Sequence, residues 1–277
     1  MFELIFVSKI LVSIMAVLGL SLVAEHVSPK VAGILSGYPL GTAIALFYIG
    51  LEISPEFAAS SAIYTLAGFS ASLVLVCSYY YTSALLLLRV KVTNGLNCFL
   101  STIAAVSSFL IAAYLISLFS FTLSISFILS LLAVLVFGGL LSKIRDAEVD
   151  DKLPITFKIT LFRAVTAALI VLIVTGIAKV VNENWAGVLS AFPITLLPFL
   201  MIIHLSYGSA KAHTIIKHYP FGLGALMIYA ASIAYLYPKI GLIAGTVVSF
   251  ILATLYLLLL ASVQHYIRAY RRRNALP

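Results

Sequence analysis

The sequence AGILSGYP at residues 32–39 returns as AGVLSAFP at residues 186–193. The two segments share five of eight positions, and the same offset of 154 residues also aligns Lys9 with Arg163. The identical pairs are Ala32 and Ala186, Gly33 and Gly187, Leu35 and Leu189, Ser36 and Ser190, and Pro39 and Pro193. We therefore interpret the chain as a duplicated unit, which in so apolar a chain predicts a pseudo-symmetric membrane protein.

The composition indicates that the solvent of this chain is a bilayer. Hydrophobic residues make up 63% of the 277 residues and charged residues only 9%, with a mean hydropathy of +1.17. A soluble domain carries about a quarter charged residues. The formal charge of +8 lies mostly in short loops between apolar segments, so it does not indicate nucleic-acid binding. Cys77 and Cys98 provide neither a disulfide framework nor metal-ligand spacing.

Nine apolar segments are each close to the length of about 20 residues that a membrane-spanning helix requires. No basic region precedes the first one, so we expect a retained span rather than a cleaved signal peptide. The third is long, and we expect it to be tilted or broken near residues 79–81. The predicted spans are 2–24, 31–51, 60–88, 95–118, 121–142, 156–181, 186–206, 213–236 and 240–266.

The basic residues orient these spans. Arg268, Arg271, Arg272 and Arg273 predict a cytoplasmic C-terminus, and nine spans then place the N-terminus outside. With this topology, 13 of the 17 Lys and Arg residues fall in inner loops and only Lys179 and Lys239 in outer ones. We therefore expect a multi-pass protein of a bacterial inner membrane.

An odd number of spans gives the duplication an inverted topology. We predict an all-α fold in which residues 1–118 form one four-helix repeat and residues 156–277 form the second, inverted one with a basic tail. Residues 119–155 supply the joining helix and a polar cytoplasmic connector. Inverted repeats of this kind let one central site face either side of a membrane in turn.

The repeated motif is the strongest candidate for a substrate site. A proline within a helix lacks an amide hydrogen, so Pro39 and Pro193 should leave the carbonyls of Leu35 and Leu189 without their helical partners. Interrupted helices at matching places in two halves are typical of transporter sites. The candidate residues are Gly33, Ser36, Tyr38 and Pro39, with Gly187, Ser190, Phe192 and Pro193. The alternative is a packing motif, in which small residues let helices approach closely.

Lys9 and Arg163 form a second candidate pair. Each lies about seven residues into the first helix of its repeat, and a charge within a membrane span is a functional hypothesis by default. As substrate-binding groups they should point into the bundle toward the repeated motif and contact an anion. The alternative is that both side chains extend to the membrane interface, since about 10 Å of helix separates them from it.

Two further residues are candidates for ion coupling. His204 lies near the end of the seventh predicted span, where it could carry a proton. Glu52 lies in the predicted outer loop after the second span, where a solvated loop charge is the alternative. No His or carboxylate pairs have metal-ligand spacing, and no catalytic motif is present. We expect neither an enzyme nor a bound metal or cofactor.

The second unit carries WAGVLSAFP at residues 185–193 and YGSAKAHTIIKHYPFG at residues 207–222. These segments resemble the small bacterial inner-membrane proteins of the GlpM type, through Ala186, Gly187, Phe192, Pro193, Gly208 and Thr214. The first unit keeps Ala32, Gly33 and Pro39 but has Tyr38 where that pattern has phenylalanine. The resemblance covers about fifty residues of each half. It implies a bacterial inner-membrane protein and no particular substrate.

The sequence thus predicts a secondary transporter that works by alternating access. Its partners would be the lipid bilayer and a small anionic metabolite or anionic lipid head group, and a homodimer is compatible with the sequence. One alternative is a flippase for lipids or polyprenyl phosphates, whose phosphate would meet the paired basic residues. Another is a non-transporting scaffold of an envelope-assembly complex.

Overall fold

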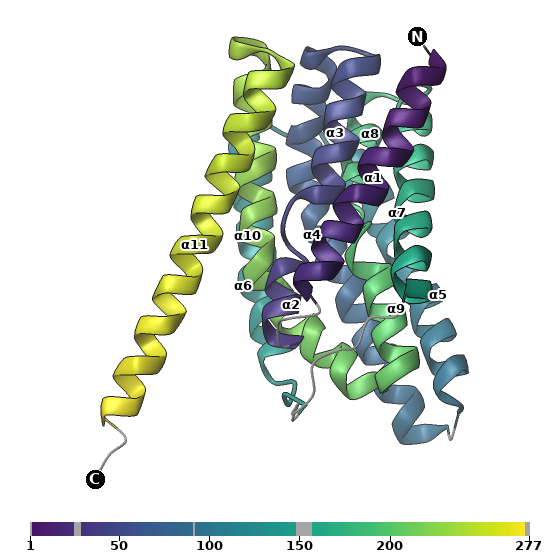
Figure 1. Cartoon of the computed structure of the whole chain (residues 1–277), viewed down its shortest axis with the longest axis vertical. Coiled ribbons are helices and arrows are strands. Elements are labelled where there is room, and N and C mark those ends of the chain that lie inside the picture. The colour runs from purple at the N-terminus through teal and green to yellow at the C-terminus, as the bar shows by residue number, and fades with distance from the viewer. Residues whose placement is uncertain (1, 25–28, 91, 148–156, 275–277) are drawn as a thin grey trace.

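The computed structural model describes residues 2–24, 29–90, 92–147 and 157–274, and all regular structure in these ranges is α-helical. Figure 1 shows the helices packed into one bundle. They are α1 (Phe2–Ala24), α2 (Pro29–Leu35), α3 (Leu40–Glu52), α4 (Pro55–Arg89), α5 (Asn94–Ser117), α6 (Leu123–Ser142), α7 (Phe157–Ile177), α8 (Glu183–Ser190), α9 (Leu196–Tyr207), α10 (Ser209–Ile240) and α11 (Leu242–Asn274).

The helices are those of a polytopic membrane protein. Within the described residues, six apolar helical stretches are long enough to cross a bilayer. They are 30–52, 55–89, 94–117, 123–142, 209–240 and 242–263, and the first of them contains the boundary between α2 and α3. Three further apolar helices are shorter. The all-helical membrane fold is therefore confirmed, whereas the number of nine spans stays a prediction.

Two helices form the centre of the bundle. α4 contacts α5, α6, α8 and α10, and α10 also contacts α2 and α11. Both present small buried residues to their neighbours, such as Ala58, Ser61 and Gly68 on α4 and Ala212 and Gly222 on α10. Small side chains allow backbones to approach closely in a membrane, where van der Waals packing replaces the hydrophobic effect.

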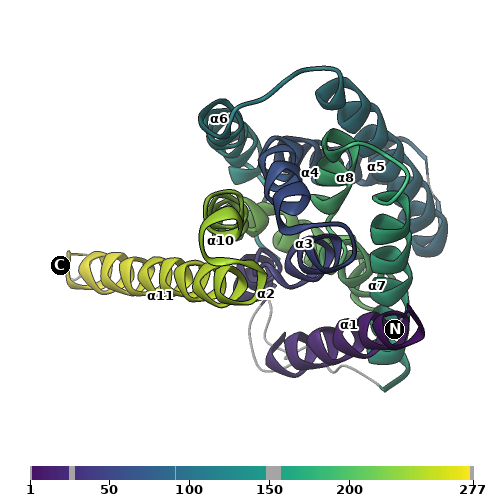
Figure 2. The same cartoon turned by 90° about the horizontal axis from the view of Figure 1, so that it is seen from above.

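The outer helices expose their apolar side chains. α5, α6 and α11 carry exposed residues such as Phe99, Leu135 and Leu259, as expected for surfaces that face lipid. Figure 2, from above, shows α11 projecting away from the bundle beyond its contact with α10. In Figure 1, the N-terminal and C-terminal ends lie at opposite ends of the bundle.

The ends of the helices follow local sequence signals. The side chains of Ser54, Thr93, Thr122 and Asn182 each accept a hydrogen bond from the amide three residues later, which caps α4, α5, α6 and α8. α4 continues through residues 79–81, so the predicted break there is wrong. No glycine or proline interrupts that part of the helix, and Tyr79 is instead held in the core.

Candidate functional site

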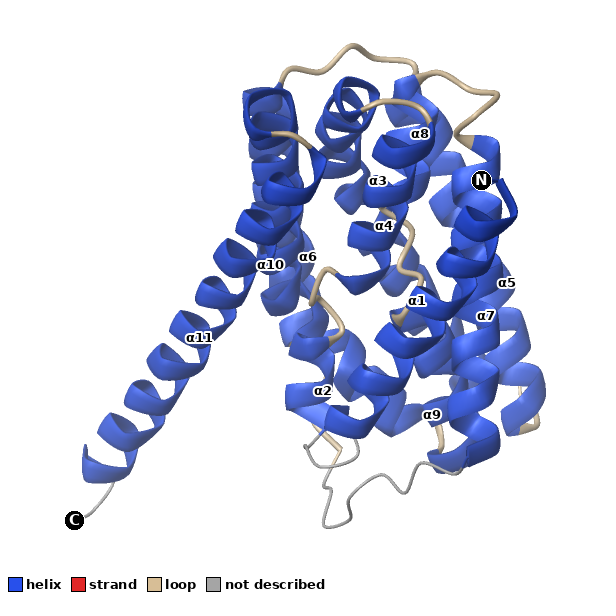
Figure 3. Ribbon diagram, turned by 45° about the horizontal axis from the view of Figure 1, so that its top comes forward, coloured by secondary structure: helices blue, strands red, loops and turns tan. Residues whose placement is uncertain are grey.

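The repeated motif interrupts a helix at both of its occurrences. The second predicted span divides into α2 and α3 around residues 36–39, and its counterpart, the seventh, divides into α8 and α9 around residues 191–195. Figure 3 shows these interruptions as loop segments inside the bundle. The break predicted at Pro39 and Pro193 is therefore confirmed, and its physical cause is the missing proline amide.

The two interruptions have the same backbone hydrogen bonds. Four bonds in the first have a counterpart 154 residues later, with lengths between 2.7 and 3.1 Å. The carbonyls of Leu35 and Leu189 lack their helical partners at the prolines, as predicted, and accept instead from the amides of Tyr38 and Phe192. In each bond the amide of the first residue donates to the carbonyl of the second. The matching bonds are Gly37 to Ile34 with Ala191 to Val188; Tyr38 to Leu35 with Phe192 to Leu189; Leu40 to Tyr38 with Ile194 to Phe192; and Ala43 to Pro39 with Leu197 to Pro193.

The serines and glycines of the motif act in helix packing. Ser36 Oγ donates to the Ala32 carbonyl at 2.8 Å and Ser190 Oγ to the Ala186 carbonyl at 2.7 Å, so each hydroxyl serves its own helix. A Cβ at Gly33 would overlap the Ile215 carbonyl of α10, and one at Gly187 would overlap the Ser61 carbonyl of α4. These glycines are therefore needed for close backbone crossings.

The interruptions meet each other at a junction lined by both motifs. Thr42 Oγ1 donates to the carbonyl of Ser190 at 3.1 Å, which joins the start of α3 to the end of α8. The junction encloses a cavity of only about 10 Å³, lined by Ser36, Tyr38, Gly41 and Thr42 from one side and by Ala191, Phe192, Pro193, Ile194 and Thr195 from the other. That volume barely holds one water molecule, so the junction is closed.

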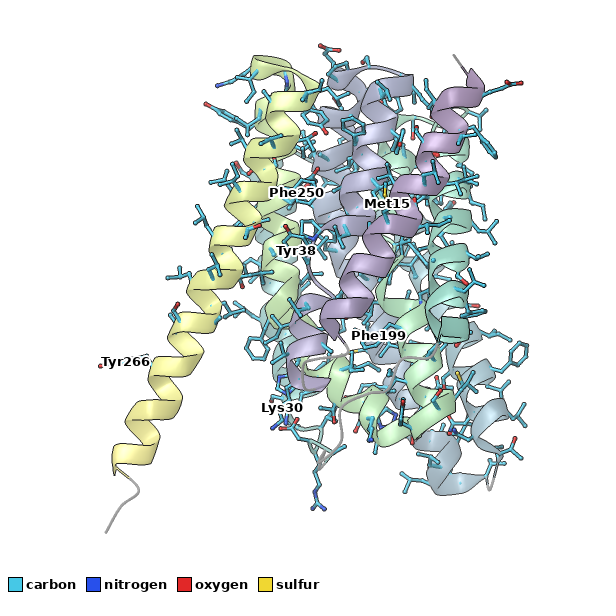
Figure 4. The ribbon with its side chains drawn as sticks, viewed as in Figure 1. Met15, Lys30, Tyr38, Phe199, Phe250 and Tyr266 are labelled. Atoms are coloured by element: carbon cyan, nitrogen blue, oxygen red, sulfur yellow. The ribbon has the colours of Figure 1, made fainter. Side chains whose placement is uncertain are left out.

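An apolar groove opens beside the first interruption. It has a volume of about 570 Å³ and is lined by α1, the α2–α3 interruption and α11, through residues that include Met15, Leu35, Tyr38 and Leu258. A neighbouring cavity of about 270 Å³ extends it along α3 to Phe250. Tyr38 forms a 3.0 Å hydrogen bond with Thr254 at this position. Figure 4 shows Tyr38 between Met15 of α1 and Phe250 of α11.

Lys9 is buried inside the bundle. Its side chain is 5% exposed, and Nζ lies 2.5 Å from Glu52 Oε2 and 2.8 Å from Thr175 Oγ1. Lys179 Nζ lies 3.1 Å from the other carboxylate oxygen, and the ring of Tyr48 lies 5.5 Å from Lys9 Nζ. Lys9 is therefore enclosed by side chains of this protein, and its partner is a carboxylate of this chain rather than the repeated motif.

Glu52 corrects a prediction made from the sequence. It is the last residue of α3 and its side chain is only 7% exposed, so it is not a solvated loop charge. The sequence assigns Thr175 no role, although it completes this cluster from α7. Arg163 also lies on α7, but its side chain is outside the part of the chain that the structure describes. Its predicted role stays a prediction.

His204 belongs to a second buried cluster. Its ring is fully buried, with Nδ1 at 2.8 Å from the hydroxyl of Tyr79. That hydroxyl also lies 3.5 Å from Cys98 Sγ, and the His204 carbonyl accepts from Asn94 Nδ2 at 2.7 Å. Tyr79 and Cys98 come from α4 and α5, and sequence spacing alone does not bring them to His204. No group of three metal-binding side chains occurs among the described residues.

A third cluster lies at the end of α6, opposite the N-terminal end of the bundle. Asp146 Oδ2 lies 2.8 Å from Lys30 Nζ, and Oδ1 lies 3.1 Å from His218 Nε2 and 3.3 Å from Lys217 Nζ. Partial burial raises the pKa of the Asp146 carboxyl, but hydrogen bonds from Lys30, His218 and Lys217 outweigh it and lower the pKa to about 2. This cluster joins the predicted connector to α2 and α10.

Comparisons with known proteins add no further assignment. No family model matches the chain, and neither does a curated protein or a solved structure. The resemblance to GlpM-type proteins therefore stays an expectation from the sequence.

Proposed function

We propose that this chain is a membrane transporter that works by alternating access, with residues 1–118 and 156–277 as inverted repeats. The observation that carries the proposal is the junction, where two interrupted helices from the two halves meet at the repeated motif. Interrupted helices at corresponding positions of two halves commonly form transporter sites. Such a junction is an unusual feature for a scaffold, which needs no broken helix at its centre.

The packing around the junction supports the inverted repeat. Gly33 packs against the carbonyl of Ile215, and Gly187 packs against the carbonyl of Ser61. Gly187 lies 154 residues after Gly33, and Ile215 lies 154 residues after Ser61, so the two contacts are equivalent under the repeat. Gly222 meets Ile34 in the same way that Gly68 meets Val188. In Figure 1, α1 descends from the N-terminal end while its counterpart α7 rises beside it, as inversion requires.

The closed junction supports a gated pathway rather than an open channel. A cavity of about 10 Å³ cannot hold a metabolite, so passage requires α2–α3 and α8–α9 to separate. Because their backbone bonds across the interruptions are local turns, each half can move without breaking a continuous helix. Alternate separation on the two sides would expose the junction to each compartment in turn.

For the substrate we retain a small anionic metabolite or an anionic head group. Lys9 gives this class little support, since Glu52 already neutralises it. Arg163 is then the cationic residue on which the anion proposal depends. We further propose an inner-membrane location with the N-terminus outside, supported by the apolar helices and by the ends of the chain lying at opposite ends of the bundle.

A second candidate function is translocation of an amphipathic lipid. It is favoured by the apolar groove of about 570 Å³, whose size is in the range of sites that bind small organic ligands. The groove is in contact with the first interruption through Leu35, Tyr38 and Leu40. An acyl or polyprenyl tail in the groove would place an attached head group near the junction.

Thiol labelling can test alternating access without knowledge of the substrate. We would introduce Thr42→Cys or Thr195→Cys while keeping the two buried native cysteines, and add a membrane-impermeant thiol reagent to right-side-out and inside-out vesicles, with the labelling of the unmutated chain subtracted. Both junction positions should react from both sides. The control Ala105→Cys, in the equally buried core of α5, should react from neither.

Labelling of the junction from neither side, or from one side only, would contradict alternating access and favour the scaffold. Spin-labelled lipids separate the two substrate classes. A fluorophore would be attached at Leu258→Cys, and lipids with a spin label on the acyl chain would be added as quenchers. Quenching that a competing lipid relieves, but soluble anions do not, would favour the lipid function.

A further inference from the structure

His204 has a buried ring nitrogen without a partner. The residue lies in the last turn of α9, and none of its surface is exposed. Nδ1 pairs with the Tyr79 hydroxyl at 2.8 Å, whereas Nε2 has no hydrogen-bond partner. A buried polar atom that forms no hydrogen bond costs about 1–3 kcal/mol, so its presence requires an explanation.

The hydrogen-bond chain around His204 determines which nitrogen carries the hydrogen. Cys98 Sγ lies 3.7 Å from the Met201 carbonyl, to which the thiol is the available donor. Because the thiol hydrogen is then directed to Met201, we infer that Tyr79 donates its hydroxyl hydrogen to Cys98 Sγ at 3.5 Å, although the distances alone fit either direction. The hydroxyl oxygen therefore accepts from Nδ1–H of His204. Nε2 is left as a bare lone pair.

The side chains that contact the His204 ring in the described structure are not carboxylic acids or strong bases, and the nearby α10 also carries Lys211, whose Nζ lies 4.8 Å from the centre of the Tyr207 ring at the end of α9. Tyr79 faces the ring from α4 and Cys98 from α5, and His213 of α10 lies close enough to interact electrostatically. His213 Nε2 pairs with Ser83 Oγ at 3.0 Å. α7 also packs on α9 and carries Arg163, whose side chain is not described. No ion pair in the described ranges involves His204.

We propose that Nε2 of His204 is a proton-binding site whose occupancy drives the opening of the junction. This inference rests on the proposed function, because it names the ion coupled to that movement. A hydronium ion from the water phase donates the proton to the Nε2 lone pair, so one of its O–H bonds breaks, an N–H bond forms and a water molecule is left. The imidazolium keeps its Nδ1–H bond to Tyr79.

The position of His204 explains how one proton would act on the junction. α9 begins at Leu196, directly after the second interruption, and ends three residues beyond His204. A positive charge without a counter-ion is costly in this buried place, so protonation favours a conformation in which Nε2 meets water or an anion. A displacement of α9 moves Thr195 and Ile194, which line the junction.

Nitrogen NMR can test the proton site on the unmutated chain. The protein, labelled with ¹⁵N-histidine, would be reconstituted in lipid bilayers and measured from pH 8 to pH 5. His204→Asn assigns the signal, and His213→Asn is the matched control. We expect one ring with Nδ1 protonated and Nε2 bare at pH 8, which gains a hydrogen at Nε2 on acidification. A hydrogen on Nε2 at pH 8, or a ring that never titrates, would overturn the proposal.

Tyr79→Phe is the second variant. It removes the acceptor of Nδ1–H, so the signal of His204 should change to a mixture in which Nε2–H is populated. An unchanged tautomer would contradict the assigned direction of the hydrogen-bond chain. A purely structural role of Tyr79 would not alter the tautomer in a folded protein.

Junction labelling at two pH values separates the two proposals. A pKa that differs by one unit between two conformations shifts their ratio about tenfold. We therefore expect Thr42→Cys to label about tenfold faster at pH 5 than at pH 8, after normalisation to an exposed reference cysteine, and this dependence should be lost with His204→Asn. Labelling from both sides without any pH dependence would leave the transporter proposal intact and overturn proton coupling. Labelling from neither side would overturn the transporter proposal. In that case only the NMR experiment would decide whether Nε2 of His204 binds a proton.

Discussion

The Lys9–Glu52 cluster and the Tyr79–His204 cluster are both buried polar groups in an apolar bundle, yet they differ in what they leave unsatisfied. Between α1, α3 and α7, the ammonium of Lys9 has a carboxylate and a hydroxyl as partners, and the carboxylate has a second cation. Between α4, α5 and α9, the chain of hydrogen bonds ends at a nitrogen with no partner.

This difference changes which residue is the better candidate for function. A lysine within a predicted span stands out in the sequence, but a buried charge with its own counter-ion is a structural connection between helices. A neutral histidine is less conspicuous, but a vacant buried acceptor can receive something that the resting structure does not supply. The predictions below test this contrast.

The largest effect is expected for Lys9→Met. It leaves the Glu52 carboxylate buried with Lys179 as its remaining cation, and breaking a buried ion pair costs about 3–5 kcal/mol. We expect a loss of unfolding free energy near the lower end of that range, measured by thermal denaturation in detergent. The double variant Lys9→Met with Glu52→Gln removes both charges and should recover most of the loss. If the double variant is as unstable as the single one, the pair is not what stabilises this contact.

A smaller effect is expected for Tyr79→Phe. It leaves the Nδ1–H of His204 without an acceptor, in addition to the vacant Nε2, and should cost about 1–3 kcal/mol. Tyr219→Phe is the matched control, because its side chain is also buried and no hydrogen bond of its hydroxyl is found among the described residues. Equal losses from the two substitutions, in the same denaturation assay, would mean that the His204 hydrogen bond contributes nothing of its own.

The smallest effect on unfolding free energy is expected at Asp146, because its ion pairs are partly exposed to solvent. Its side chain is 28% exposed, so we discount the lowered pKa for solvent screening and expect Asp146→Asn to cost about 1 kcal/mol. Because the folded pKa of about 2 lies below the ordinary aspartate pKa of 3.8, this stability is present above pH 4 and is lost as the pH falls toward 2. The difference in melting temperature between Asp146→Asn and the unmutated chain should therefore shrink from pH 6 to pH 3. A constant difference over this range would mean that the carboxylate charge is not responsible.

Much of the fold can be predicted from the sequence because its signals are local. The proline motif predicts both interruptions, since the missing amide acts on its own helix wherever that helix lies. Serine, threonine and asparagine caps likewise mark where helices begin. The Leu35 and Leu189 carbonyls lose their helical partners as predicted, but only the structure shows that a tight turn brings the amides of Tyr38 and Phe192 to them.

The sequence by itself determined that this chain is an apolar, all-helical membrane protein with a motif that breaks two helices 154 residues apart. These properties depend on composition and on backbone chemistry within a few residues. Only the tertiary structure decided that Glu52 neutralises Lys9, that the two interruptions meet in a closed junction and that His204 keeps a vacant nitrogen. The physical reason is that hydrogen bonds and ion pairs act over a few ångströms, and partners 43 to 166 residues apart in the chain come within that range only when the helices pack.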